Sequence, residues 1–252
     1  MKSAYESLAP LYDRLMADVD YDGWAAYLLR LMHRYLPAVS SPAVLECACG
    51  TGEITRRLLD SGCTVTASDV SAEMLAIAQQ KLRLAGHASA PVVLQDMRRL
   101  LAHRPVDAVI AACDGVNYLT GDGDARSFFR SAQEALKPGG LLLFDISSAY
   151  KLTNILDGRV YGDAFSDVAY LWRNVYDART RLLGMDLAFF IKRADGAYKR
   201  SDESQVQRAY ETEELTQSLA ACGFAVLGTF DAFTENDAAA DSERIQFAAR
   251  RE

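Results

Sequence analysis

Short apolar runs alternate with amphipathic segments between residues 43 and 147. The amphipathic segments predict helices over 51–62, 71–86 and 124–140, and the apolar runs predict strands over 43–49, 63–70, 91–97, 106–114 and 141–147. Apolar strands separated by helices are typical of βαβ units, in which a parallel sheet is buried on both faces. Right-handed crossovers are expected between these strands.

The chain after residue 210 follows a different pattern. A helix is predicted over 211–224, with acidic residues in its first turn and Gly223 at its end. Two strands follow, over 224–233 and 243–251, with a polar stretch but no helix between them. Such strands pair as an antiparallel hairpin, here at one edge of the sheet. The prediction is therefore an α/β protein whose sheet is mostly parallel.

Two segments lie outside this alternation. Residues 1–40 predict helices rich in aromatic side chains, which are Tyr5, Tyr12, Tyr21, Trp24, Tyr27 and Tyr35. Residues 148–210 predict an inserted antiparallel sheet, with strands over 167–177 and 181–193 joined by a turn. We therefore expect three parts, which are an N-terminal helical lid (1–40), a core (41–147 and 211–252) and an inserted β subdomain (148–210) that roofs a substrate or forms an interface.

Composition narrows the classes of protein. Of 252 residues, 50% are hydrophobic and 24% are charged, as in ordinary globular proteins. No apolar run approaches the roughly 18 residues that a membrane span needs, and the N-terminal segment lacks the compact apolar stretch of a signal peptide. The five cysteines lie mostly in apolar surroundings, which favours reduced thiols and a cytoplasmic location.

The net charge argues against a nucleic-acid partner, and the placement of histidine and cysteine argues against a metal site. The net charge of −7, from 27 basic and 34 acidic residues, opposes a nucleic-acid partner. The three histidines do not cluster with the cysteines, and Cys47 and Cys49 would point to opposite faces of a strand. We therefore predict no metal site.

A glycine-rich turn follows the first predicted strand and opens a helix; its sequence is Glu46-Cys47-Ala48-Cys49-Gly50-Thr51-Gly52. Glycines let a ligand approach the backbone, and the first N–H groups of the following helix are free to bind it. Asp69 ends the next strand, where a carboxylate can accept two hydrogen bonds from a ribose diol. Asp69 could instead cap the helix that follows.

Two further acids belong to the same edge of the sheet. Asp96 follows the third predicted strand and Asp114 the fourth, and the carboxyl ends of parallel strands meet at one edge. Asp96 could equally be a solvated loop acid, and Asp114 a turn or helix cap. Glu46 would repel a pyrophosphate but attract an ammonium group. This favours a nucleoside that carries an amino acid, namely S-adenosylmethionine, over a dinucleotide.

These motifs together resemble the class I S-adenosylmethionine-dependent methyltransferases over residues 40–147; they are LECACGTG, SDVSAEML, QDMRRL, VDAVIAACDGVNYL and LKPGG. The resemblance implies a Rossmann-like seven-stranded, mostly parallel sheet with an antiparallel last strand, plus a small antiparallel β insertion. The tyrosine-rich opening segment AYESLAPLYDRLM and the inserted sheet are similar to a small-molecule branch that includes the dTDP-aminosugar N-methyltransferases.

The resemblance implies roles in cofactor binding. The residues expected to bind S-adenosylmethionine are Tyr12, Glu46, Ala48, Gly50, Gly52, Asp69, Val70, Met74, Asp96, Met97 and Cys113. The glycine-rich turn would line the methionine end, Asp69 would hold the ribose, and Asp96 would accept from the adenine amino group. Val70, Met74 and Met97 would wall the adenine, although the two methionines could instead fill the core.

Three residues would lie near the reacting methyl group. Cys113 would face the sulfonium, and Asp114 is the candidate catalytic base for a protonated nucleophile. Tyr12 would cover the cofactor, or could equally serve helix packing. One position departs from the family, because Ala48 replaces the usual first glycine. Its methyl group is tolerable if the residue keeps a negative φ.

The predicted function is transfer of a methyl group to N or O of a small-molecule acceptor by in-line displacement. No nucleic-acid or membrane partner is expected, and the inserted sheet could serve as the interface of a homodimer. Two alternatives stay open at this point, which are a nicotinamide-dependent oxidoreductase and a non-catalytic nucleoside-binding scaffold. The loop spacing and Glu46 argue against the first, and the departure at Ala48 is the one support for the second.

Overall fold

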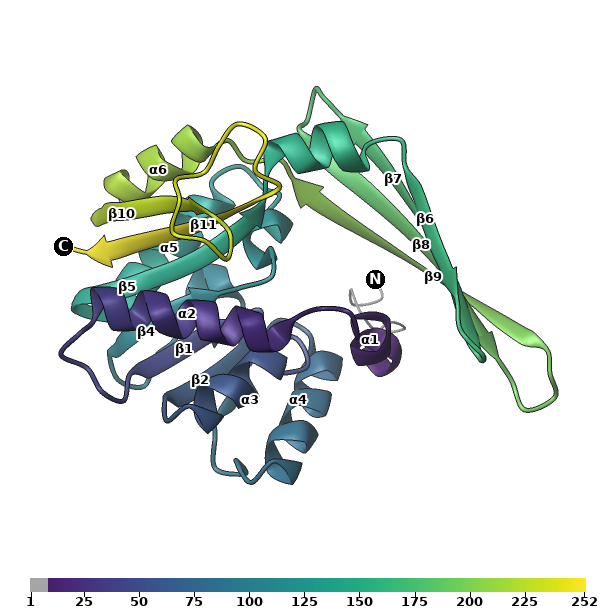
Figure 1. The fold of residues 1–252 in the computed structure, drawn as a ribbon, viewed down its shortest axis with the longest axis horizontal. Helices are drawn as coiled ribbons and strands as arrows, with labels where there is room; N and C mark the ends of the chain where they lie inside the picture. The colour runs from purple at the N-terminus through teal and green to yellow at the C-terminus, as the bar shows by residue number, and fades with distance from the viewer. Residues whose placement is uncertain (1–8) are drawn as a thin grey trace.

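The computed structural model describes residues 9–252 and contains two separate sheets (Figure 1). The larger sheet has seven strands in the order β10-β11-β5-β4-β1-β2-β3. Its strands are β1 (Ala43–Cys47), β2 (Thr64–Asp69), β3 (Val92–Leu94), β4 (Val106–Ala111), β5 (Leu136–Ser147), β10 (Phe224–Asp231) and β11 (Arg244–Arg251). Strands β1 to β5 pair in parallel, whereas β11 is antiparallel to both β5 and β10. The seven-stranded, mostly parallel sheet with an antiparallel last strand is confirmed.

Helices cover both faces of this sheet. They are α2 (Tyr21–Tyr35), α3 (Glu53–Asp60), α4 (Ala72–Leu84), α5 (Asp124–Ala135) and α6 (Thr212–Ala221). Alternate residues of one strand point to opposite faces, so Val44 packs with α2 and α3 whereas Leu45 packs with α5 and α6. Ser71 caps the start of α4, because its side chain accepts a hydrogen bond from the Met74 amide. None of the described helices is long and apolar enough to cross a membrane.

Two predicted element boundaries are wrong. The helix predicted over 124–140 ends at Ala135, and the Lys-Pro-Gly-Gly stretch already belongs to β5. Proline and glycine oppose a helix here, and the register of β5 against β4 shifts after Leu136 to accommodate the extra residues. The third predicted strand is shorter than expected, because Asp96 caps a single 3-10 turn, η1 (Met97–Arg99).

The smaller sheet is the inserted segment, and it is entirely antiparallel. A π-helical turn, η3 (Lys151–Leu156), leads into β6 (Val160–Ala164), β7 (Val168–Asp177), β8 (Leu182–Lys192) and β9 (Tyr198–Arg208). The two strands predicted from the sequence correspond to β7 and β8. Strands β6 and β9 were not predicted, because most of their side chains are exposed and show no apolar alternation.

A short helix, α1 (Ala9–Leu15), lies between the core and the inserted sheet (Figure 1). It contacts both parts. Asp13 forms an ion pair with Lys81 of α4 at 2.7 Å, and Arg14 forms one with Asp167, next to β7. Tyr5, in the tyrosine-rich opening segment, lies outside the described residues.

Candidate active site

Two neighbouring cavities lie beyond the carboxyl ends of the parallel strands, with volumes of about 470 and 540 Å³. The first is bounded by the core, and the second lies between the core and the inserted sheet. Four side chains line both cavities: Tyr12, Tyr21, Cys113 and Tyr118. These four residues therefore form the boundary across which the two cavities meet.

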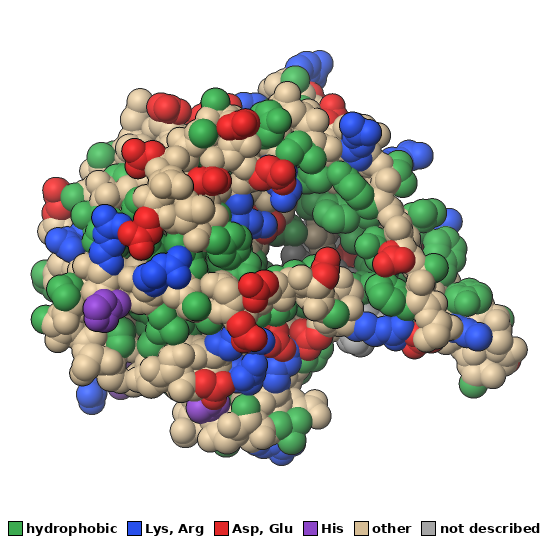
Figure 2. Space-filling view, viewed as in Figure 1, with side chains coloured by type: hydrophobic (Ala, Val, Ile, Leu, Met, Phe, Trp, Pro, Cys, Tyr) green, Lys and Arg blue, Asp and Glu red, His purple; other side chains and the backbone are tan. Residues whose placement is uncertain are grey.

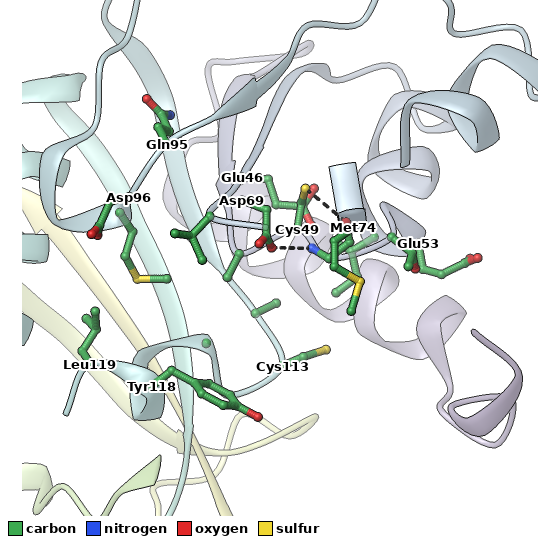
Figure 3. Close-up of a pocket in the computed structure, with 18 of the residues that line it drawn as sticks. Glu46, Cys49, Glu53, Asp69, Met74, Gln95, Asp96, Cys113, Tyr118 and Leu119 are labelled. Atoms are coloured by element: carbon green, nitrogen blue, oxygen red, sulfur yellow. Dashed lines mark hydrogen bonds between the residues drawn. The ribbon is translucent and has the colours of Figure 1, made fainter. Parts of the chain in front are cut away.

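The structure brings most of the predicted cofactor residues to the first cavity (Figure 3). Ten of them line it: Tyr12, Glu46, Ala48, Gly50, Asp69, Val70, Met74, Asp96, Met97 and Cys113. Gly52 is not among them. It caps α3 with a φ of 79°, and a Cβ there would lie 3.1 Å from the Cβ of Ala78. Gly52 therefore allows α3 to approach α4 closely.

Asp69 is fixed by the backbone on both of its oxygens. The Gly50 amide donates to Oδ2 at 2.9 Å, and the Ser71 amide donates to Oδ1 at 2.8 Å (Figure 3 shows the first bond). Burial raises the pKa of this carboxyl group. A carboxylate has about four acceptor sites, so the two occupied ones leave capacity for hydroxyl groups of a ligand in the cavity.

Glu46 is almost fully buried beside the glycine-rich turn. The Thr55 hydroxyl donates to its Oε2 at 2.5 Å, and burial raises the pKa of the carboxyl group to about 8. The carboxyl group is therefore mostly protonated at pH 7, and a cation placed beside it would favour the ionised form.

The departure at Ala48 takes a form that the sequence did not predict. Its φ is 51°, so the condition of a negative φ is not met. A left-handed conformation brings the side chain of an L-residue close to its own backbone and is costly for any residue but glycine. A further constraint comes from Gly115, where a Cβ would lie only 3.0 Å from the Cβ of Ala48.

Charged residues gather at the far end of the first cavity. The guanidinium of Arg98 binds Asp96 and also Asp124, the latter at 3.1 Å, and it lowers the pKa of Asp96. Met74 is buried whereas Val70 is 70% exposed, so this wall of the cavity opens to solvent. Arg98 and Asp124 were missed, because their meeting depends on where α5 begins relative to η1.

The turn after β4 separates the two cavities. Cys113 and Asp114 both have positive φ, 59° and 55°, which is rare for consecutive residues other than glycine. Asp145 of β5 accepts a hydrogen bond from the Asp114 amide at 2.9 Å and also binds the guanidinium of Arg244. This turn is thus held by an acid that is itself completely buried.

Asp114 lines only the second cavity. Arg244 donates to its Oδ1 at 2.9 Å and Gln207 to its Oδ2 at 2.6 Å. Asn117, three residues after Asp114, bonds the backbone of Ser147 and Arg208 and is buried. Arg244 and Gln207 lie 130 and 93 residues from Asp114, so local sequence reasoning could not assign them to the site.

Aromatic side chains dominate the wall of the second cavity. They come from the inserted sheet and from α2, and they include Trp24, Tyr161, Tyr170, Trp172 and Phe189. Figure 2 shows hydrophobic side chains gathered where the inserted sheet faces the hollow beside the core. The aromatic richness of residues 1–40 and 148–210 was the main sequence signal for this cavity. Within residues 9–252, no cluster of His, Cys, Asp or Glu is suited to hold a metal ion.

The chain is similar in sequence to known and provisionally named methyltransferases. A family model described as a methyltransferase domain matches residues 44–140. YqeM of Bacillus subtilis (strain 168), provisionally named as a methyltransferase, is 35% identical over 250 residues, which are 98% of this chain and 97% of YqeM. An N,N-dimethyltransferase of Streptomyces fradiae that acts on dTDP-3-amino-3,6-dideoxy-alpha-D-glucopyranose is 31% identical over 140 residues, 55% of this chain and 52% of that protein.

A solved structure is similar over the whole length. An S-adenosylmethionine-dependent methyltransferase from Clostridium acetobutylicum ATCC 824 is 30% identical and superposes with a TM-score of 0.87, covering 98% of each chain. The relatives and the fold exclude both the oxidoreductase and the non-catalytic scaffold, and they give the methyl donor as S-adenosylmethionine. The chain belongs to the S-adenosylmethionine-dependent methyltransferases.

Proposed function

We propose that this enzyme methylates a small-molecule acceptor held in the second cavity, on a nitrogen atom in preference to oxygen. The observation that carries this proposal is the pair of cavities that share Tyr12, Tyr21, Cys113 and Tyr118. A donor on one side and an acceptor on the other would meet only at this boundary. Methyl transfer needs this alignment and the exclusion of water more than it needs a catalytic group.

The first cavity fits the methyl donor. Its volume of about 470 Å³ lies within the range of small-molecule sites. We assign Glu46 and the glycine-rich turn to the methionine end, Asp69 to the ribose, and Asp96 to the adenine amino group. Met74 and Met97 supply apolar walls for the adenine. When bound, S-adenosylmethionine supplies a methyl carbon activated by the adjoining sulfonium.

Asp114 is the proposed base. It lines the acceptor cavity next to the boundary, and Arg244 and Gln207 fix the direction of its carboxylate. An acceptor ammonium would transfer one proton to Asp114, and the freed lone pair would form the N–C bond as the C–S bond breaks. The electron pair of that bond stays on sulfur, and Asp114 later releases the proton to water.

Nitrogen is favoured over oxygen because of the groups at the boundary. An alkyl ammonium has a pKa of about 10, whereas an alcohol holds its proton far more firmly, nearly as firmly as water does. A carboxylate held in an ion pair can assist the first but is too weak to deprotonate the second. Burial also raises the pKa of Tyr12 well above its usual value, so this phenol stays protonated and cannot accept the proton of an alcohol.

The test is isotope transfer from methyl-labelled S-adenosylmethionine to a panel of amines and their matched alcohols. We expect label in amines only. Asp114→Asn should lower the transfer rate at least 100-fold while the Kd of S-adenosylhomocysteine changes less than about twofold. Equal labelling of alcohols would contradict the preference for nitrogen, and failure of the protein to bind S-adenosylhomocysteine would contradict the assigned cofactor site.

The cytoplasmic location and the homodimer stay predictions. Exposed apolar residues on the outer face of the inserted sheet, Leu171, Val175 and Val206, are consistent with a homodimer interface there. Sedimentation velocity measures this directly.

A further inference from the structure

The charges around the second cavity specify its occupant more closely than its shape does. Resting on the function proposed above, we infer that the acceptor is a cationic amine on an apolar ring, free of phosphate and carboxylate groups. Three features of the cavity favour such an occupant: the balance of charge in its lining, the pairing of its cations, and its aromatic walls.

The charged side chains that line this cavity are balanced: Asp114 and Glu243 line it together with Arg244 and Lys151. Two more carboxylates lie directly behind the lining: Asp145 accepts from the Asp114 amide, and Glu203 accepts from the lining residue Gln205 at 2.8 Å. Burial raises the pKa of Asp145 to about 6, so this carboxyl group is still ionised at pH 7. The lining therefore carries no net positive charge that would attract an anion.

Both of these cations already lie beside carboxylates. Arg244 binds Asp114 and Asp145 and also stacks on the ring of Trp24 at 5.4 Å. The Nζ of Lys151 lies 3.5 Å from Glu243. Phosphate and carboxylate ligands are bound by Arg or Lys groups that can face them. Among residues 9–252, the lining of this cavity offers no cation without a carboxylate neighbour.

The aromatic walls suit the same ligand. Tyr161 and Trp172 lie against each other with ring centroids 5.6 Å apart, and Tyr170 pairs across the strands with Phe189. Ring faces attract a cation and stack on another flat ring, and they offer nothing to an anion. The Streptomyces fradiae relative acts on a dTDP-linked sugar. The cavity described here lacks the groups that would neutralise such a diphosphate.

The experiment compares two probes of nearly equal shape and opposite charge, tryptamine and indole-3-propionate, by calorimetry on the full chain saturated with S-adenosylhomocysteine. We expect tryptamine to bind at least about tenfold more tightly than indole-3-propionate, and dTDP to show no binding in this cavity. Equal or tighter binding of the anion, binding of dTDP, or no binding of tryptamine at millimolar concentration would overturn the inference.

Paired variants assign the effect to this cavity. Glu243→Gln frees Lys151 and should shrink the preference for tryptamine severalfold, whereas Glu235→Gln, whose ion pair with Arg34 lies outside the cavity, should leave it unchanged. Trp172→Leu should weaken tryptamine binding at least about fivefold, with Tyr198→Leu on an exposed part of the same sheet as the control.

This design separates two kinds of failure. If S-adenosylhomocysteine itself does not bind, the proposed function fails. If it binds and the charge preference is reversed, or both variants of a pair behave alike, only the inference about the acceptor fails.

Discussion

At the scale of single residues, Ala48 shows how a site can retain a costly backbone conformation. The residue lies in the glycine-rich turn with a φ of 51°, and its Cβ lies close to Gly115 in the wall of the cofactor cavity. A side chain in this conformation costs roughly 1 kcal/mol. The fold tolerates this, because the turn is fixed by the hydrogen bond from the Gly50 amide to Asp69.

We therefore expect Ala48→Gly to raise the free energy of unfolding by about 1 kcal/mol without weakening the binding of S-adenosylhomocysteine. Urea unfolding and calorimetry on the same samples measure both quantities. Ala78→Gly, in the middle of α4, is the matched control and should destabilise the protein by a similar amount, because glycine is unfavourable in a helix. A destabilised Ala48→Gly would mean that the methyl group makes contacts that outweigh the strain.

Glu46 gives a second prediction, on pH. Its carboxyl group has a pKa of about 8 because burial disfavours the ionised form. A cationic ligand beside it favours ionisation, so binding at pH 6 must release a proton, whereas at pH 8 about half of the molecules already carry the carboxylate. The affinity for S-adenosylhomocysteine should therefore rise about tenfold from pH 6 to pH 8. The Glu46→Gln variant should show a flatter profile, and a slope equal to that of the unmodified protein would contradict this assignment.

Most of the residues predicted to bind the cofactor line one cavity in the structure. Glu46 and Asp69 lie near the carboxyl ends of their strands, and Gly50 and Asp96 follow strands, so their positions in the chain were enough to place them at one edge of the sheet. Gly52 does not line the cavity, and its lack of a side chain allows α3 to approach α4 closely. The partners of Asp114 come from distant strands, and only the folded sheet order brings them to it.

At the scale of elements, three strands cooperate to hold the turn between the cavities. Asp145 of β5 receives the amide of Asp114 after β4 and the guanidinium of Arg244 from β11. The apolar alternation of these strands was readable from the sequence. Asp114, Asp145 and Arg244 interrupt this alternation only as single polar residues, so the sequence did not indicate that they form a buried ionic cluster. For the same reason β9, whose side chains are mostly polar, was not predicted as a strand at all.

We expect Asp145→Ala to destabilise the protein by about 3–5 kcal/mol, because it leaves a buried guanidinium short of one partner and the Asp114 amide without an acceptor. The free energy of unfolding in urea measures this. Asp202→Ala removes an acid from an exposed ion pair with Arg200 and should change stability by less than about 1 kcal/mol. Equal effects of the two substitutions would show that the buried cluster is not a special constraint.

At the scale of the whole molecule, α1 joins two parts that otherwise enclose the cavities from opposite sides. Toward the core, Asp13 accepts from Lys81 at 2.7 Å and from the hydroxyl of Thr51 at 2.5 Å. Toward the inserted sheet, Arg14 donates to Asp167 at 2.7 Å and its guanidinium lies 5.5 Å from the ring of Phe165. Tyr12, between these two attachments, lines both cavities, so ligands that enter or leave past α1 must break at least one attachment.

The attachment to the inserted sheet is the weaker one, because its ion pair is open to water and is screened by salt. We therefore expect Asp167→Asn to speed the release of S-adenosylhomocysteine severalfold, as measured by stopped-flow fluorescence, with almost no change in Tm. Added salt should speed release from the unmodified protein toward the rate of the variant and have little further effect on the variant itself. Asp195→Asn, which removes an exposed ion pair with Arg193 that includes no residue of α1, is the matched control. If both variants release the ligand at the rate of the unmodified protein, the contact of α1 with the inserted sheet does not limit exchange.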